Sequence, residues 1–176
     1  MRPHTPLQLA RRIHSDAQRL GLALGRAPRP VPPKDPADLY DWLMSSEPLR
    51  SATRKLFMDG HYAEAVEEAY KCVNNTVKSK SGLSRDGQDL MHHAFSEENP
   101  VLKLNALRTA SERDEQAGYR LVFAGCMTGI RNPRAHGHDL RDDPQAALEL
   151  LVWANHLMRV VAGARRVPRR RKVKMP

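Results

Sequence analysis

The sequence predicts an all-α protein whose body is a bundle of four or five helices. Apolar residues recur at helical spacing in several segments, and capping residues or prolines mark where those segments begin and end. No segment shows the sustained alternation of apolar and polar residues that is typical of strands. The 176 residues, 40% of them hydrophobic, are enough for one domain with tails.

The first 34 residues are expected to form a helix followed by a linker. The stretch "PLQLARRIHSDAQRLGLAL" has a loose helical pattern, and "GRAPRPVPPKDP" places five prolines in twelve residues. Such a proline-rich stretch is extended and acts as a spacer. We therefore place a boundary near residue 34, with the helical body over residues 35–163.

The first half of the body predicts three helices. In "DPADLYDWLM" Asp35 is the expected cap and Pro36 the first helical position. The next stretch, "SEPLRSATRKLFMDG", runs from a cap at Ser46 to a stop at Gly60. Residues 61–80 form the clearest helix, since seven apolar residues follow its spacing: Tyr62, Ala65, Val66, Ala69, Tyr70, Val73 and Val77.

The second half predicts a loop and two long helices. Residues 81–100 are expected to be a loop with one short helix around Leu90. A strong apolar stripe then follows, with Ser111 as the expected cap, and Pro133 should end this helix near Arg131. The last helix begins with an Asp cap and Pro144. Trp42 and Trp153 are expected in the core or in dimer contacts.

Positive charge gathers at the two ends of the chain. Residues 1–34 hold seven Lys or Arg and one Asp, and residues 164–176 hold seven Lys or Arg and no acid. Because the total is +9, the body is mildly acidic. The basic tail over residues 164–176 is expected to be disordered, and it indicates either contact with a polyanion or simple solubilisation. An aromatic fraction of 5% gives no platform for base stacking.

The cellular compartment is predicted from signals that are missing in the sequence. The first residues contain no apolar signal region, and the longest apolar run is too short to span a membrane. The cysteines Cys72 and Cys126 lie in apolar helical patterns without a CxxC partner. We expect buried thiols, no metal, no cofactor, no membrane contact and a cytoplasmic location.

The stretch "GIRNPRAHGHDL", residues 129–140, contains the groups that RNA cleavage requires. A histidine near neutral pKa can transfer protons, and an arginine can bind phosphoryl oxygens. Spacing alone does not identify the pair. With 21 arginines and eight histidines, about three matches arise by chance, and the chain has four. Context favours Arg131 with His136, because they fall between the two strongest C-terminal helices.

Three stretches also resemble the Ymh-type proteins of the HEPN superfamily. They are "GHYAEAVEEAYKCVNN", "SGLSRDGQDLMHHAFS" and "ERDEQAGYRLVFAGCMTGIRNPRAH". The resemblance covers roughly residues 45–162 and is most specific at "GIRNPRAH". It implies a helical bundle that dimerises and brings the Arg and His of both protomers to one cleft.

The resemblance implies a metal-independent endoribonuclease that acts as a toxin or in phage defence and leaves 2′,3′-cyclic phosphate and 5′-hydroxyl ends. Carried over by motif, Arg131 and His136 are the catalytic residues and Asn132 is their polar neighbour. The expected partners are RNA, a second copy of the chain, and an antitoxin or defence-complex protein. The alternative is a non-catalytic module that binds nucleic acid or protein. Expected RNA contacts are Arg134, His138, Arg165, Arg166, Arg169, Arg170, Arg171, Lys172 and Lys174.

Overall fold

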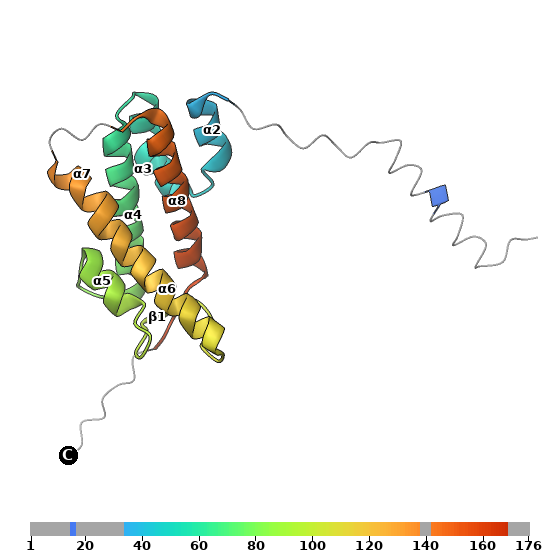
Figure 1. Ribbon diagram of the computed structural model, residues 1–176, viewed down its shortest axis with the longest axis vertical. Helices are drawn as coiled ribbons and strands as arrows, with labels where there is room; N and C mark the ends of the chain where they lie inside the picture. Colours follow the sequence, from blue (N-terminus) through green and yellow to red (C-terminus); the bar gives the residue numbers. More distant parts are fainter. Residues whose placement is uncertain (1–14, 17–33, 138–141, 169–176) are drawn as a thin grey trace, which may run out of the picture. The chain divides into compact units, whose positions relative to one another are not determined.

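The computed structural model describes residues 15–16, 34–137 and 142–168, and the chain divides into two units after Pro33. In the second unit the helices pack together with negligible sheet, which confirms the all-α class (Figure 1). Its described elements in chain order are α2 (Pro36–Leu43), α3 (Glu47–Met58), α4 (Tyr62–Ser81), α5 (Gly87–Ala94), β1 (Leu102–Lys103), α6 (Ala110–Cys126), η1 (Met127–Arg131), α7 (Asn132–His136), α8 (Pro144–Gly163) and β2 (Arg165–Arg166).

Two of the four predicted caps, Asp35 and Asp143, cap their helices. The carboxylates of Asp35 and Asp143 accept hydrogen bonds from the first backbone N–H groups of α2 and α8. Ser46 stands at the start of α3, but its side chain makes no capping bond. Instead Asn155 of α8 accepts from the backbone N–H groups of Ser45 and Ser46, at 3.1 and 2.9 Å. A residue distant in sequence thus satisfies donors that a local cap usually takes.

Helix α6 starts earlier than predicted. Its cap is Thr109 rather than Ser111, and Thr109 Oγ1 accepts from the backbone N–H of Glu112 at 3.2 Å. The Glu112 carboxylate in turn accepts from the backbone N–H of Thr109 at 3.3 Å. This reciprocal pair satisfies two of the free donors at the helix start, which Ser111 does not do.

The prediction that Pro133 ends the helix near Arg131 is wrong. Helix α6 runs directly into the π-helical turn η1 and then into α7, which continues to His136. In η1 the backbone N–H of Asn132 reaches the carbonyl of Met127, five residues back. The π-turn shifts the hydrogen-bond register just before the proline ring, and this shift lets the helix pass a residue that has no N–H.

Helix α4 lies at the centre of the bundle and packs against α3, α8 and η1. The Tyr70 hydroxyl donates to the carbonyl of Leu150 on α8 at 3.1 Å. Trp42 and Trp153 are not in the core, since they are 51% and 40% exposed. Cys126 is buried, whereas Cys72 is only partly so. No helix in the described ranges is long and apolar enough to cross a membrane.

The described start of the predicted tail is not disordered. Arg165 and Arg166 form β2, which pairs antiparallel with β1. The next residue extends this contact, since the N–H of Val167 donates to the carbonyl of Val101 at 2.9 Å. The sequence offered no strand signal here because two residues per strand are too few to show alternation.

Candidate active site

Arg131 lies at the last position of η1, with its side chain half-buried. Its Nη1 donates to Oδ1 of the adjacent Asn132 at 3.3 Å. Its Nε is buried and has no hydrogen-bond partner among the described residues. A buried guanidinium N–H without an acceptor costs free energy, and Arg120 Nε is also buried without a partner among the described residues.

His136 lies on the last turn of α7 and is exposed. Residues five apart on a regular helix point about 140° away from each other, so Arg131 and His136 diverge within one chain. No hydrogen bond joins them, and no described side chain orients the His136 ring. One protomer therefore presents the two groups on one short helix but does not bring them to one point.

A second polar group lies at the start of α5, the helix that packs against η1. The buried Asn74 of α4 donates from Nδ2 to Asp86 Oδ1 at 2.5 Å, and its Oδ1 accepts from the Gly87 N–H at 2.9 Å. Lys78 Nζ lies 3.7 Å from the same Asp86 oxygen. This start of α5 is tied to η1, since Thr128 Oγ1 donates to Gln88 Oε1 at 3.0 Å.

The pKa of Asp86 lies below its ordinary value, chiefly because the Asn74 amide donates to the carboxylate. The positive charges of Lys78 and Arg131 lower the pKa further. Asp86 is therefore a stable anion beside the candidate arginine. One sequence signal could have found the group: Asn74 interrupts the apolar stripe of α4, between Val73 and Val77.

Arg134, an expected RNA contact, is occupied within the fold. Its guanidinium makes two bonds of 2.7 Å to the Asp142 carboxylate and one of 2.9 Å to the carbonyl of Ile130. The two charged side chains are only 9% and 10% exposed. Arg134 thus satisfies a carbonyl of the π-turn and anchors the approach to α8, and its guanidinium is not presented to a phosphate.

The other expected RNA contacts lie elsewhere. Arg165 and Arg166 are exposed on β2, and the Arg166 guanidinium lies over Gly82. In Figure 1 the strand β1, their pairing partner, lies at the lower end of the bundle, whereas α7 lies at the upper left. The remaining expected contacts fall outside the described residues: His138, Arg169, Arg170, Arg171, Lys172 and Lys174.

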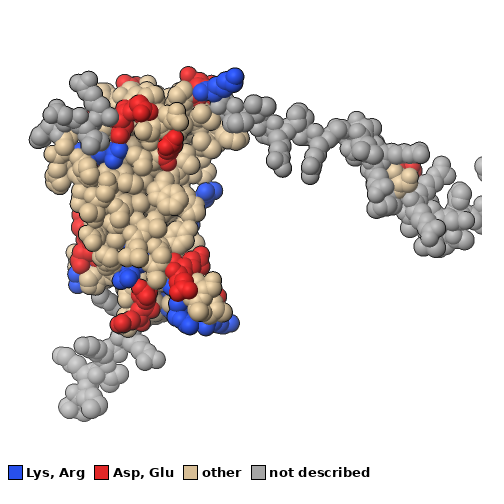
Figure 2. All heavy atoms as spheres, viewed as in Figure 1, with Lys and Arg blue, Asp and Glu red and all other residues tan. Residues whose placement is uncertain are grey.

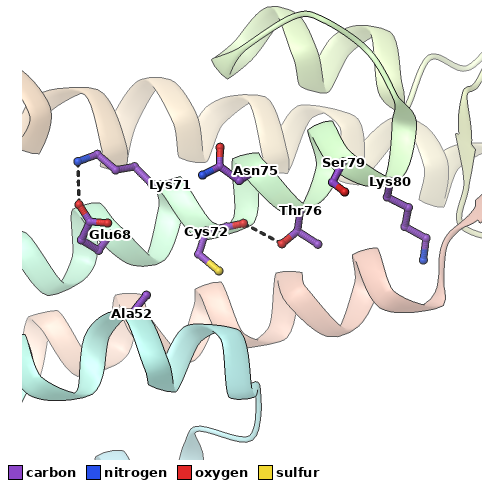
Figure 3. Close-up of a pocket in the computed structure, with 8 residues that line it drawn as sticks. All are labelled: Ala52, Glu68, Lys71, Cys72, Asn75, Thr76, Ser79 and Lys80. Atoms are coloured by element: carbon purple, nitrogen blue, oxygen red, sulfur yellow. Dashed lines mark hydrogen bonds and ion pairs between the residues drawn. The ribbon is translucent and has the colours of Figure 1, made fainter.

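A groove of about 690 Å³ along α4 is lined by polar residues and by Cys72, but not by Arg131 or His136 (Figure 3). Several of its polar groups are already engaged: Lys71 pairs with Glu68 at 2.8 Å, and Thr76 donates to the carbonyl of Cys72 at 2.8 Å. Lys80 donates to two carbonyls at the end of α8. Burial raises the pKa of the Cys72 thiol, which disfavours the reactive thiolate.

The described residues also contain no group of three or more His, Cys, Asp or Glu that could hold a metal ion. This finding applies to the ranges that the structure describes, and it leaves the ends of the chain and residues 138–141 aside. The candidate site remains the one that the sequence motif indicated, Arg131 and His136.

Comparison with known proteins places the chain among related sequences. The model of a family described as "Protein of unknown function (Hypoth_ymh)" matches residues 46–161. That range begins just before α3 and ends within α8, so it contains Asn74, Asp86, Arg131 and His136. No curated protein matches the chain. No solved structure matches it either.

Proposed function

The chain belongs to the Hypoth_ymh family of proteins of unknown function, and from this premise we propose that it is a metal-independent endoribonuclease of the HEPN type. The supporting observation is the junction of η1 and α7, where Arg131 keeps a buried Nε without a partner and His136 is exposed. The guanidinium of an arginine can bind phosphoryl oxygens, and an exposed imidazole can reach a substrate.

Cleavage then follows by attack of the ribose on its own phosphate. One His136 takes the proton of the 2′-hydroxyl, and the 2′-oxygen forms a bond to phosphorus. The bond from phosphorus to the 5′-oxygen breaks, and a second, protonated His136 gives its proton to that oxygen. Arg131 binds the phosphoryl oxygens and stabilises the charge that develops on them. The products are a 2′,3′-cyclic phosphate and a 5′-hydroxyl.

A second copy of the chain supplies the second histidine in this scheme. The outer face of α6 supports such a pairing, because Leu121 is 58% exposed and shares this face with Gly118 and Gly125. No atom lies within 4 Å of a side chain built on either glycine, so another helix can approach closely. Figure 2 shows few charged side chains over the middle of the face that α6 crosses in Figure 1.

The dimer is tested by placing a charge on this face. Leu121→Glu is expected to convert a dimer to a monomer in light scattering and to lower RNA cleavage in parallel, because a buried carboxylate without a partner disfavours association. Ser51→Glu is the control, since it places the same charge at an exposed position of α3. A Leu121→Glu protein that remains dimeric and fully active would contradict this arrangement.

The activity itself is tested by end-group mapping. Purified protein is incubated with a structured RNA pool, with and without EDTA, and the ends of the products are identified. Cyclic phosphate and 5′-hydroxyl ends that form equally in EDTA are the expected result. Intact RNA, or 3′-hydroxyl and 5′-phosphate ends, would overturn the proposal.

One observation favours a second candidate, a non-catalytic module that binds nucleic acid. No described side chain holds the His136 ring, whereas general bases are commonly oriented by a third group. In that case the protein binds RNA without changing it. Removing residues 169–176, which leaves β2 in place, then separates the binding surfaces, since unchanged affinity places binding in the body and lost affinity with intact folding places it in the tail.

A further inference from the structure

The start of α5 departs from the usual pattern of a helix start. Asp86 occupies the N-cap position, but its side chain makes no capping hydrogen bond. The buried Asn74 of α4 performs the capping instead, by accepting from the Gly87 N–H at 2.9 Å. The Asp86 carboxylate is thereby released from capping and is held by the other end of the same amide, at 2.5 Å.

The released carboxylate lies next to the turn that carries Arg131. Helix α5 packs against η1, and Thr128 of η1 donates to Gln88 on the first turn of α5 at 3.0 Å. The hydrogen bond from Asn74 is the main cause of the lowered pKa of Asp86, and the charges of Lys78 and Arg131 lower it further. Lys78 is the ion-pair partner of Asp86 among the described residues, so Arg131 acts on it from beyond 4.0 Å. Asp86 is therefore the acidic residue of the group that it forms with Asn74 and Lys78, and the two cations that act on it are Lys78 and Arg131.

Arg131 has little else to hold its guanidinium in place. Its one side-chain bond is the 3.3 Å contact to the adjacent Asn132, and its Nε has no partner among the described residues. A long side chain held so weakly is ordered mainly by charge. The Asp86 carboxylate, which the buried Asn74 amide fixes, can supply this ordering. It does not move with Arg131, and it does not bind the guanidinium so tightly that a phosphate is excluded.

We propose that Asp86, fixed by Asn74, is a positioning residue that orients the Arg131 guanidinium toward the RNA phosphate. The inference rests on the proposed nuclease function. The Asp86 side chain is 59% exposed. Its role is to set the direction of the guanidinium, not to contact RNA.

Asp86→Asn tests this role, because asparagine is the same size and can still accept from Asn74 while carrying no charge. The turnover number is expected to fall about 10- to 100-fold, as misplaced catalytic groups do, with a KM changed less than about threefold. Asp89→Asn is the matched control: Asp89 is on the same helix and pairs with Arg85 and His93, away from this group.

Asp86→Asn should have no further effect in an Arg131→Ala background, whereas a merely structural role gives additive losses.

A second measurement does not depend on cleavage. The heteronuclear NOE of the Arg131 Nε–H group, assigned with Arg131→Lys, should fall in Asp86→Asn and remain unchanged in Asp89→Asn. If the wild type cleaves no RNA, the nuclease proposal fails. The NOE alone then tests whether Asp86 orders the Arg131 side chain. The inference is overturned if the Arg131 NOE is unchanged in Asp86→Asn, or if the losses in the double variant are additive. Faster cleavage by Asp86→Asn would also overturn it, because it would mean that Asp86 only repels the phosphate.

Discussion

Replacing His136 with alanine is expected to lower the rate of RNA cleavage by about 10²- to 10⁴-fold, the usual contribution of a proton-transferring side chain. Because His136 is exposed on the last turn of α7 and forms no hydrogen bond to a described side chain, its loss should leave the fold intact. The measurement is the initial rate of cyclic-phosphate formation, with circular dichroism as the check on folding.

His61→Ala is the matched control for this change. His61 is also exposed, at the start of α4, and it follows Arg54 at a spacing that fits the same motif. The structure separates the two pairs, since Arg54 is already bound to Asp41 through two bonds of 2.8 and 2.7 Å. Cleavage that survives His136→Ala but not His61→Ala would contradict the assignment.

Replacing Asp142 with alanine is expected to lower the free energy of unfolding by about 3–5 kcal/mol, because it leaves the enclosed Arg134 charge without a partner. Both side chains are about a tenth exposed, and two bonds of 2.7 Å join them. Urea denaturation at one fixed protein concentration measures the loss, since a dimer's stability depends on concentration.

The control for this change is an exposed ion pair in the same chain. Asp41 is 37% exposed and pairs with Arg50 and Arg54, so Asp41→Ala should cost less than about 1 kcal/mol. The double change Arg134→Met with Asp142→Leu should recover most of the stability, because it removes both charges and keeps apolar volume. If Asp142→Ala and Asp41→Ala lower the free energy of unfolding equally, burial does not make the Arg134–Asp142 pair more important for stability than an exposed pair.

The helices themselves were largely predictable, since their signals are local. Asp35 with Pro36, and Asp143 with Pro144, mark helix starts within a few residues of sequence, and the stripe from Tyr62 to Val77 marks a buried face. The start of α6 was misplaced by a residue or two because both Thr109 and Ser111 can cap a helix. Only the bond from Thr109 to Glu112 decides between them.

The candidate site was predictable only in part. The motif and its resemblance indicated Arg131 and His136, but they placed Arg134 on the RNA and His136 beyond the helix. The structure differs on both points, because Arg134 reaches Asp142 across the approach to α8 and the π-turn carries the helix past Pro133. Neither the ion pair nor the altered register has a signature in residue spacing.

By itself the sequence determined the helical class, most helix boundaries and the arginine and histidine that define the candidate site, since caps, apolar periodicity and motifs act over a few neighbouring residues. Only the tertiary structure decided which polar groups meet. It joined Asn74 to Asp86 and set both beside Arg131, and it engaged Arg134 within the fold. These contacts depend on how separate helices pack, because packing brings together side chains that are far apart in the chain.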